Sequence, residues 1–164
     1  MSSSVAKDLA AIKNAKAYRE LGPINPARFE VPTVSQWVFS VGLKEWELGE
    51  DKKRKYMKKT LTFSNFREAW LFMRLVSEVA DRIDHHPEWF NVYNRVEILL
   101  STHTVNSLSF KDMVLAHAIE AAKATVETSS KTDVSQSGYN TQGPIDQFAD
   151  TTFTSLLTKV EKLT

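Results

Sequence analysis

A run of apolar residues at helical spacing constrains the fold of this chain more than any other feature. Between residues 66 and 83 the apolar positions recur every three or four residues, which is the period of one face of an α-helix. They are Phe66, Ala69, Trp70, Met73, Val76, Val79, Ala80 and Ile83. Ser64 or Asn65 precedes the run and can cap it, and Pro87 stops any continuation because proline lacks the N–H donor. The pattern predicts one amphipathic helix with a buried apolar face.

Pairs of strands are predicted on both sides of this helix. Residues 45–48 and 57–63 alternate between apolar and polar, and residues 49–52 between them predict the turn of a hairpin. Residues 89–93 and 96–101 predict a second pair, joined through residues 94 and 95. A last helix is expected after Ser109, because Ser109 and Asp112 have the spacing of a capping box. The order of two strands, helix, two strands, helix predicts an α+β fold, in which helices pack on one face of a four-stranded antiparallel sheet.

The chain also has extensions on both sides of this predicted domain. We divide it into an N-terminal extension (residues 1–30), the α+β domain (31–126), a polar linker (127–144) and a C-terminal amphipathic helix (145–164). The linker is rich in Ser, Thr, Gln and Gly, which is the composition of a flexible segment. The C-terminal helix must bury its apolar stripe against the domain or against another subunit. Residues 5–20 and 33–41 predict further helical segments.

Composition excludes several classes of protein. The 164 residues include no cysteine, so a disulfide framework, a thiolate metal site and a cysteine nucleophile are excluded. The net charge of +1 argues against direct nucleic-acid binding, which normally needs a basic excess. No apolar run reaches the roughly 18 residues of a membrane span, and residues 1–20 lack the apolar centre of a secretory signal. We expect a cytoplasmic protein. The nucleus is a second location if the basic run at residues 52–55 is an address, although a solvated hairpin turn explains the same lysines.

The chemistry of the chain is concentrated in its histidines. Three of the four lie within nineteen residues, at His85, His86 and His103. Histidine has an unperturbed pKa of about 6.5, so it can give and take protons near neutral pH. These histidines lie where the predicted helix meets a strand and where the partner strand ends, and such positions commonly carry binding and catalytic groups. Trp89 and Phe90 beside them offer an aromatic wall for a flat ligand. A lone histidine is usually structural, but this set predicts a proton-transfer site.

A metal centre is the competing interpretation. The three histidines with Asp81 or Asp84 offer ligands that zinc or iron would accept. The adjacent His85 and His86 would, however, project in different directions from an extended backbone, and the sequence has no pair of histidines one helical turn apart. A serine hydrolase is less favoured still, because no Gly-x-Ser-x-Gly motif is present. We therefore expect neither a metal nor a cofactor.

The residues from Asp81 to Asp112 resemble the signature of the pterin-4a-carbinolamine dehydratases, also known as dimerisation cofactors of a homeodomain transcription factor. The shared pattern is Asp81, His85-His86-Pro87, Tyr93, His103 and Asp112 at fixed spacing, and the resemblance covers about residues 46–123. It implies a small domain with a four-stranded antiparallel sheet that assembles as a homodimer or homotetramer, with a transcription factor as a further partner. It also implies dehydration of 4a-hydroxytetrahydropterin to quinonoid dihydropterin, which recycles the pterin of aromatic amino-acid hydroxylases. A non-catalytic dimerisation module is the alternative.

The resemblance also implies roles for single residues. His85 and His103 would be the proton-transfer pair and His86 would orient the pterin, which is the substrate and not a cofactor. The dehydration needs one proton delivered to the departing 4a-hydroxyl and one removed from N5, which is general acid–base work. Contacts to the substrate are expected from Asp81, Asp84, Pro87, Trp89 and Asp112.

Three positions carry a further expectation. Asp81 is the candidate for holding a histidine in one tautomer. Asp112 has a structural interpretation as the third residue of the helix that Ser109 caps. Where relatives have glycine this chain has Ser107, which would be strained if the turn there needs a positive φ.

Overall fold

The protein is described from a computed structural model, which covers residue 43, residues 45–129 and residue 151. Several predicted segments lie outside the described residues. They are the N-terminal extension, the helices at residues 5–20 and 33–41, the linker from residue 130 onward, and the helix at residues 145–164 apart from residue 151. None of the helices in the described part is both long enough and apolar enough to cross a membrane.

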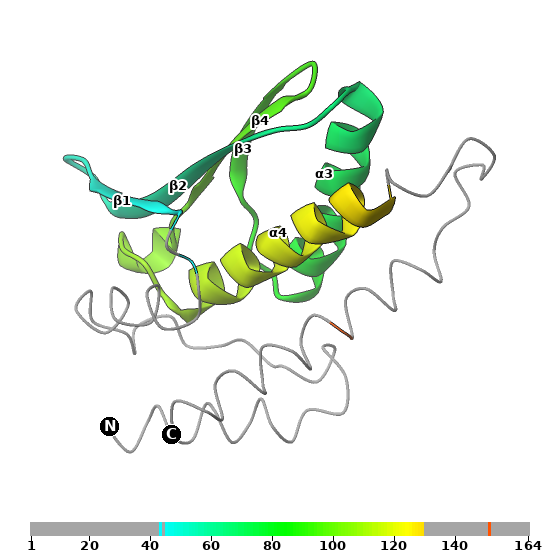
Figure 1. Ribbon diagram of the computed structural model, residues 1–164. Coiled ribbons are helices and arrows are strands. Elements are labelled where there is room, and N and C mark those ends of the chain that lie inside the picture. Colours follow the sequence, from blue (N-terminus) through cyan, green and yellow to red (C-terminus); the bar gives the residue numbers. More distant parts are fainter. Residues whose placement is uncertain (1–42, 44, 130–150, 152–164) are drawn as a thin grey trace.

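Four strands form one antiparallel sheet in the order β1-β2-β4-β3. Their bounds are β1 Glu47–Glu50, β2 Lys55–Thr62, β3 Glu88–Val92 and β4 Arg95–Leu100. Two long helices, α3 (Phe66–Arg82) and α4 (Phe110–Ser129), lie together on one side of this sheet (Figure 1). A short 3-10 helix, η3 (His103–Val105), follows β4. The predicted α+β fold and the predicted order of its elements are confirmed.

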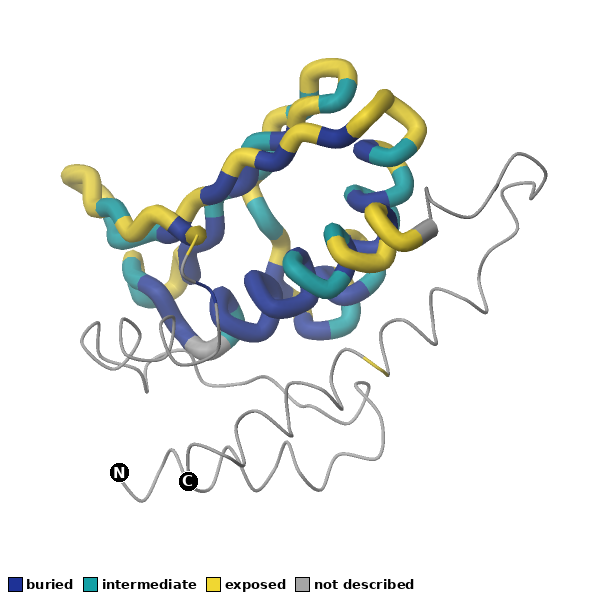
Figure 2. Tube along the Cα trace, in the orientation of Figure 1, coloured by how far each residue is buried: buried dark blue, intermediate teal, exposed yellow. Residues whose placement is uncertain are grey.

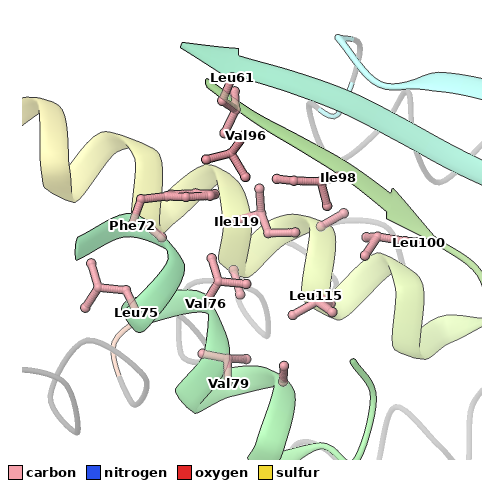
Figure 3. Packing of buried hydrophobic residues seen from close by; sticks show 14 of the residues in the cluster. Leu61, Phe72, Leu75, Val76, Val79, Val96, Ile98, Leu100, Leu115 and Ile119 are labelled. Carbon is pink, nitrogen blue, oxygen red and sulfur yellow. The ribbon is translucent and has the colours of Figure 1, made fainter. Parts of the chain in front are cut away.

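The core lies between the sheet and the two helices. Alternate residues of β2 and β4 are buried, and the register pairs Met57 with Leu100 and Leu61 with Val96. In Figure 3 the side chains of β4 point toward those of α3 and α4, and in Figure 2 the buried residues line the space between the two layers. Each fully buried aliphatic side chain contributes roughly 1.5–3 kcal/mol through loss of contact with water. The packing therefore holds the end of α3, the end of β4 and the start of α4 in fixed relative positions.

Helix α3 begins and ends close to its predicted bounds. Asn65 is the N-cap, and its side chain accepts a hydrogen bond from the Glu68 N–H at 3.0 Å. Glu68 in turn accepts one from the N–H of Ser64 at 3.0 Å, so both candidate capping residues take part in the start of the helix. The helix ends at Arg82, one residue before the last position of the predicted apolar stripe.

The turn between β1 and β2 differs from the prediction. It occupies residues 51–54 instead of 49–52, because the Asp51 carboxylate accepts hydrogen bonds from the backbone N–H groups of Lys53 (2.7 Å) and Arg54 (3.0 Å). Side chains of Asp commonly initiate turns in this way. Gly49 lies within β1, where a Cβ would stand 2.5 Å from the ring of Tyr56. This glycine makes room for an aromatic side chain and does not form the turn.

Two smaller differences concern the end of the domain and the loop after β4. Residues 127–129, which the composition assigned to the linker, are the last residues of α4. Ser107 does not have the positive φ that would strain it, because the left-handed residue of that loop is Asn106, with φ of 49°. Asparagine adopts this conformation more readily than most residues.

Candidate active site

The end of α3 determines where the adjacent histidines leave the helix. The N–H of Asp84 donates to the Asp81 carbonyl (3.2 Å), and the N–H of His85 donates to the Ala80 carbonyl (3.0 Å). These two bonds are those of a Schellman motif, whose left-handed residue is usually glycine. Asp84 occupies that position here, with φ of 48°, and its short polar side chain makes the conformation less costly than it is for most residues. The side chain of Lys111 donates to the Asp84 carbonyl (2.9 Å) and joins this turn to α4.

The start of α4 confirms the predicted capping box. The N–H of Ser109 donates to Oδ2 of Asp112 at 2.7 Å, and the N–H of Lys111 donates to the Ser109 hydroxyl at 3.2 Å. The hydroxyl of Thr102, the residue before η3, donates to the same Oδ2 at 2.6 Å. A carboxylate at this position also faces the positive end of the helix dipole. The structural interpretation of Asp112 is therefore confirmed.

Asp112 also binds a histidine. Its other oxygen, Oδ1, lies 2.8 Å from Nε2 of His85. The side chain of Asp112 is 0% exposed and that of His85 is 8% exposed, so water competes little for this hydrogen bond. The resemblance implied that Asp112 contacts the substrate, and this stays a prediction. In the structure the carboxylate of Asp112 is buried and hydrogen-bonded to His85.

His103 lies at the other side of the site, on the exposed turn after β4. It begins η3, and the turn is closed by the hydrogen bond from the Thr102 N–H to the Ser107 carbonyl at 2.9 Å. Its Nε2 lies 3.1 Å from Oε1 of Glu88, which is the first residue of β3. Arg54 reaches the same carboxylate from the turn before β2, with Nη2 at 2.8 Å from Oε2 and Nη1 bonded to Oε1. The hydrogen bond from Arg54 holds the pKa of Glu88 below its ordinary value.

His86 has the weakest carboxylate partner of the three histidines. Its Nε2 lies 3.5 Å from Oδ1 of Asp81, and both side chains are mostly exposed. Such a pair is well solvated and contributes little. The sequence offered Asp81 as the carboxylate that holds a histidine in one tautomer, but in the structure Asp112 makes the stronger contact of this kind, with His85.

Two hollows in the surface meet at His86. The first, which we call the histidine hollow, has a volume of about 350 Å³ and is lined by Asp84, His85, His86, Thr102, His103, Thr104 and Lys111. The second, the tryptophan hollow, has a volume of about 340 Å³ and is lined by Ser77, Glu78, Ala80, Asp81, His86, Pro87 and Trp89. The structure thus brings the three histidines together as predicted, and places Trp89 in the neighbouring hollow. Trp89 is half-buried and packs against the core.

Five residues that line the histidine hollow or contact His103 were not among the predicted ones. Thr102, Thr104 and Lys111 line the histidine hollow, and Arg54 and Glu88 contact His103. Glu88 directly follows Pro87, so its position next to the His-His-Pro motif could have indicated that it belongs to the site. Arg54 belongs to a basic run that a solvated turn also explains, and its approach to His103 depends on the pairing of β2 with β4. Within residues 45–129, no group of three or more His, Asp or Glu side chains is arranged to hold a metal ion.

Comparison with known proteins gives one consistent result. The family model described as pterin 4 alpha carbinolamine dehydratase matches residues 33–122. A protein of Novosphingobium aromaticivorans is 48% identical over 79 residues, which are 48% of this chain and 80% of the relative. A protein of Rhizobium rhizogenes is 46% identical over 83 residues, which are 51% of this chain and 80% of the relative. Both are provisionally named pterin-4-alpha-carbinolamine dehydratase.

A solved structure is similar as well. It is the crystal structure of a transcriptional coactivator/pterin dehydratase from Brucella melitensis, which matches with a TM-score of 0.52 at 30% sequence identity. The match covers 58% of this chain and 98% of that one. The shared part of the fold therefore includes nearly the whole of the smaller protein.

Proposed function

The chain belongs to the pterin-4-alpha-carbinolamine dehydratase family, and from this membership we propose that it dehydrates 4a-hydroxytetrahydropterins. The substrate class includes 4a-hydroxytetrahydrobiopterin, and the product is the quinonoid dihydropterin. In this reaction the C4a–O bond breaks, N5 loses its proton, and a C4a=N5 double bond forms as water leaves. Both proton transfers suit groups that titrate near neutral pH, and each typically accelerates a reaction by about 10²–10⁴-fold.

One observation carries the proposal. His85, His86 and His103 line a single hollow, and His85 is held there by a buried carboxylate. Because Nε2 of the neutral His85 imidazole must carry the proton to donate to Asp112, Nδ1 is the nitrogen that remains free to exchange one. This is the arrangement by which a carboxylate orients the histidine of a catalytic triad.

The remaining roles follow from the two hollows. We propose that His85 and His103 form the proton-transfer pair, one delivering a proton to the 4a-hydroxyl and the other removing the N5 proton. His86 lies between the hollows, and we propose that it orients the pterin, with Trp89 beside it. No metal or cofactor takes part in this scheme, because the protons move between imidazoles and the substrate.

The test is a coupled assay with an aromatic amino-acid hydroxylase, which generates the 4a-hydroxytetrahydropterin. Its disappearance is followed by absorbance with the protein and without it. We expect faster decay with the protein present, and the same decay as in buffer for the double variant H85A/H103A. A decay that micromolar wild-type protein does not change would overturn the proposal.

Self-association is also part of the proposed function. The edge strand β3 exposes large apolar side chains, with Phe90 61% exposed and Val92 54% exposed. Apolar side chains grouped on an edge strand commonly mark a contact with another chain. We therefore propose a homodimer or homotetramer, which light scattering would detect, and a monomer at all concentrations would contradict it.

The alternative function is that of a dimerisation cofactor without catalysis. Its support is the Brucella melitensis structure, which is described as a coactivator as well as a dehydratase. Fold similarity alone does not separate the two functions. The assay above does separate them, because a binding module without catalysis would leave the decay unchanged. The three histidines in one hollow favour the enzyme, since a pure binding module has no physical need for them.

A further inference from the structure

The contacts of His103 point to a second carboxylate with a role in the site. Oε1 of Glu88 lies within hydrogen-bond distance of two nitrogens, Nη1 of Arg54 and Nε2 of His103. The guanidinium of Arg54 holds both oxygens of this carboxylate, a two-point contact that lysine cannot reproduce. The side chain of Arg54 is 18% exposed, so the contact is partly shielded from water.

The backbone brings these three residues together from separate segments. Arg54 directly precedes β2, Glu88 begins β3, and His103 follows β4. The Lys55 N–H donates to the Asn106 carbonyl (3.3 Å), and the Ser101 hydroxyl donates to the Lys55 carbonyl (2.8 Å). The turn that carries His103 is thus bonded to the residue next to Arg54, and the arrangement follows from the sheet itself.

The donors and acceptors favour one of two hydrogen-bond patterns at Nε2 of His103. Nη1 of Arg54 lies 3.2 Å from Nε2 of His103, and a guanidinium nitrogen can only donate. Nε2 cannot accept from Arg54 and donate to Glu88 at the same time. The carboxylate is the stronger acceptor and is already placed by Arg54, so it receives both donors. The contact between Arg54 and His103 is then a consequence of their common partner.

We propose that Glu88, held by Arg54, is the positioning residue of His103. It fixes the proton of the neutral imidazole on Nε2 and leaves Nδ1 as the nitrogen that exchanges a proton with the substrate. The effect of Glu88 on catalysis rests on the proposed function. The assignment of the proton to Nε2 rests on the geometry of the contacts alone. Glu88 would then serve His103 as Asp112 serves His85, from the exposed side of the site.

The first experiment measures the tautomer directly. In protein labelled with ¹⁵N histidine, long-range ¹H–¹⁵N correlation at a pH where His103 is neutral distinguishes the two nitrogens. We expect the wild-type protein to hold the proton on Nε2, and the variant E88A to give the averaged signals of a free imidazole. Averaged signals in the wild-type protein would overturn the proposal, whatever the activity of the protein.

The second experiment measures kinetics in the full chain. We expect E88A to lower kcat by roughly 3- to 30-fold, a part of the ~10²-fold that a proton-transfer group supplies, and to leave KM within about twofold. E88Q keeps one acceptor oxygen and should recover part of the loss. R54K keeps the charge but not the two-point contact, and should fall between E88A and the wild type.

A matched control and a double variant complete the test. Glu97 is an exposed carboxylate paired with Arg95 at 2.6 Å. It lies on the same face of the sheet as Glu88, because Glu88 pairs with Leu99 and Glu97 is two residues from Leu99 on β4. The variant E97A should leave kcat unchanged. In the background of H103A, the further change E88A should cost less than twofold, because Glu88 acts through His103. Two results would overturn the inference, provided that the wild-type protein is active. One is that E88A and E97A have the same kcat, and the other is that E88A lowers kcat as much in the H103A background as in the wild type. A wild-type protein that is inactive would instead overturn the proposed function.

Discussion

Nε2 of His85 lies 2.8 Å from Oδ1 of Asp112, and this is the most enclosed of the carboxylate contacts made by the three histidines of the site, His85, His86 and His103. The contact of His103 with Glu88 spans 3.1 Å and that of His86 with Asp81 spans 3.5 Å, and both are largely exposed. The hydrogen bond between histidine and carboxylate is therefore shortest and best shielded from water at His85, weaker at His103 and weakest at His86. This order predicts how strongly the loss of each carboxylate should affect the reaction.

Replacing Asp112 by Asn should lower kcat by roughly 10- to 100-fold, a milder form of the loss seen when a triad carboxylate becomes an amide. An amide N–H facing Nε2 of His85 favours the wrong tautomer. The loss of a buried, hydrogen-bonded charge should also cost roughly 1–3 kcal/mol of unfolding free energy. Steady-state kinetics and urea unfolding measure the two effects. The control is D81N, which should leave kcat within about threefold because Asp81 is exposed. If D81N were the more damaging change, the orienting role would belong to Asp81.

Replacing His85 or His103 by Ala should lower kcat by about 10²-fold or less, since water can take over part of either proton transfer. Replacing His86 by Ala should raise KM more than it lowers kcat, because its proposed role is in binding. Full kinetic curves for the three single variants separate the two patterns. Full activity in all three would show that the site lies elsewhere.

Asp84 has a left-handed backbone at the end of α3. The variant D84G should be as stable as the wild type or slightly more stable, whereas D84A should lose roughly 1–2 kcal/mol because its Cβ is strained without a compensating polar group. Thermal unfolding measures both. Equal stability of the two variants would mean that the conformation carries no cost. A rise in KM for both variants, which both lack the carboxylate, would support the predicted contact of Asp84 with the substrate.

Acid should weaken the contribution of Glu88 to stability. The hydrogen bond from Arg54 holds the pKa of Glu88 below its ordinary value of 4.5. A lowered pKa in the folded state adds stability above the unfolded value, and this stability is lost as pH falls through the folded pKa. The difference in Tm between the wild type and E88Q should therefore be largest above about pH 5 and should shrink toward pH 3. A difference that grows in acid would have the opposite sign and would contradict this account.

Prolonged treatment with EDTA should leave the dehydration rate unchanged, because the proposed scheme moves protons and needs no cation. The measurement compares initial rates before and after treatment and again after zinc or iron is added. Loss of activity on chelation, with recovery on adding one of these metals, would make the histidines ligands and the mechanism metal-assisted.

The parts of the fold that depend on local pattern could be predicted from the sequence. Helix α3 follows from its apolar spacing, and the start of α4 follows from Ser109 and Asp112, because both signals lie within a few residues. The turn between β1 and β2 was predicted two residues too early. Gly49 suggested a turn, but its role depends on Tyr56 across the hairpin, which spacing alone does not show.

The candidate site was predictable to the extent that its residues lie close together in the sequence. His85, His86 and His103 lie within nineteen residues of one another, and the resemblance added Asp112 to the site. The contact of Asp112 with His85 and the contact of Arg54 with Glu88 join residues 27 and 34 positions apart, and they depend on tertiary packing. The division into two hollows depends on the direction of each side chain, which the sequence also leaves open.

The two oxygens of Asp112 serve different parts of the molecule, and this affects how a sequence of this kind reports on activity. A chain that lost the carboxylate would lose the start of α4 along with the partner of His85, so selection for a folded domain alone would preserve it. His103 lies on an exposed turn, and its loss would cost the fold little. Among descendants of such a domain that had lost catalytic activity, Asp112 would be retained long after His103 had been substituted. The state of His103 is therefore the more informative sign of whether a chain is still an enzyme.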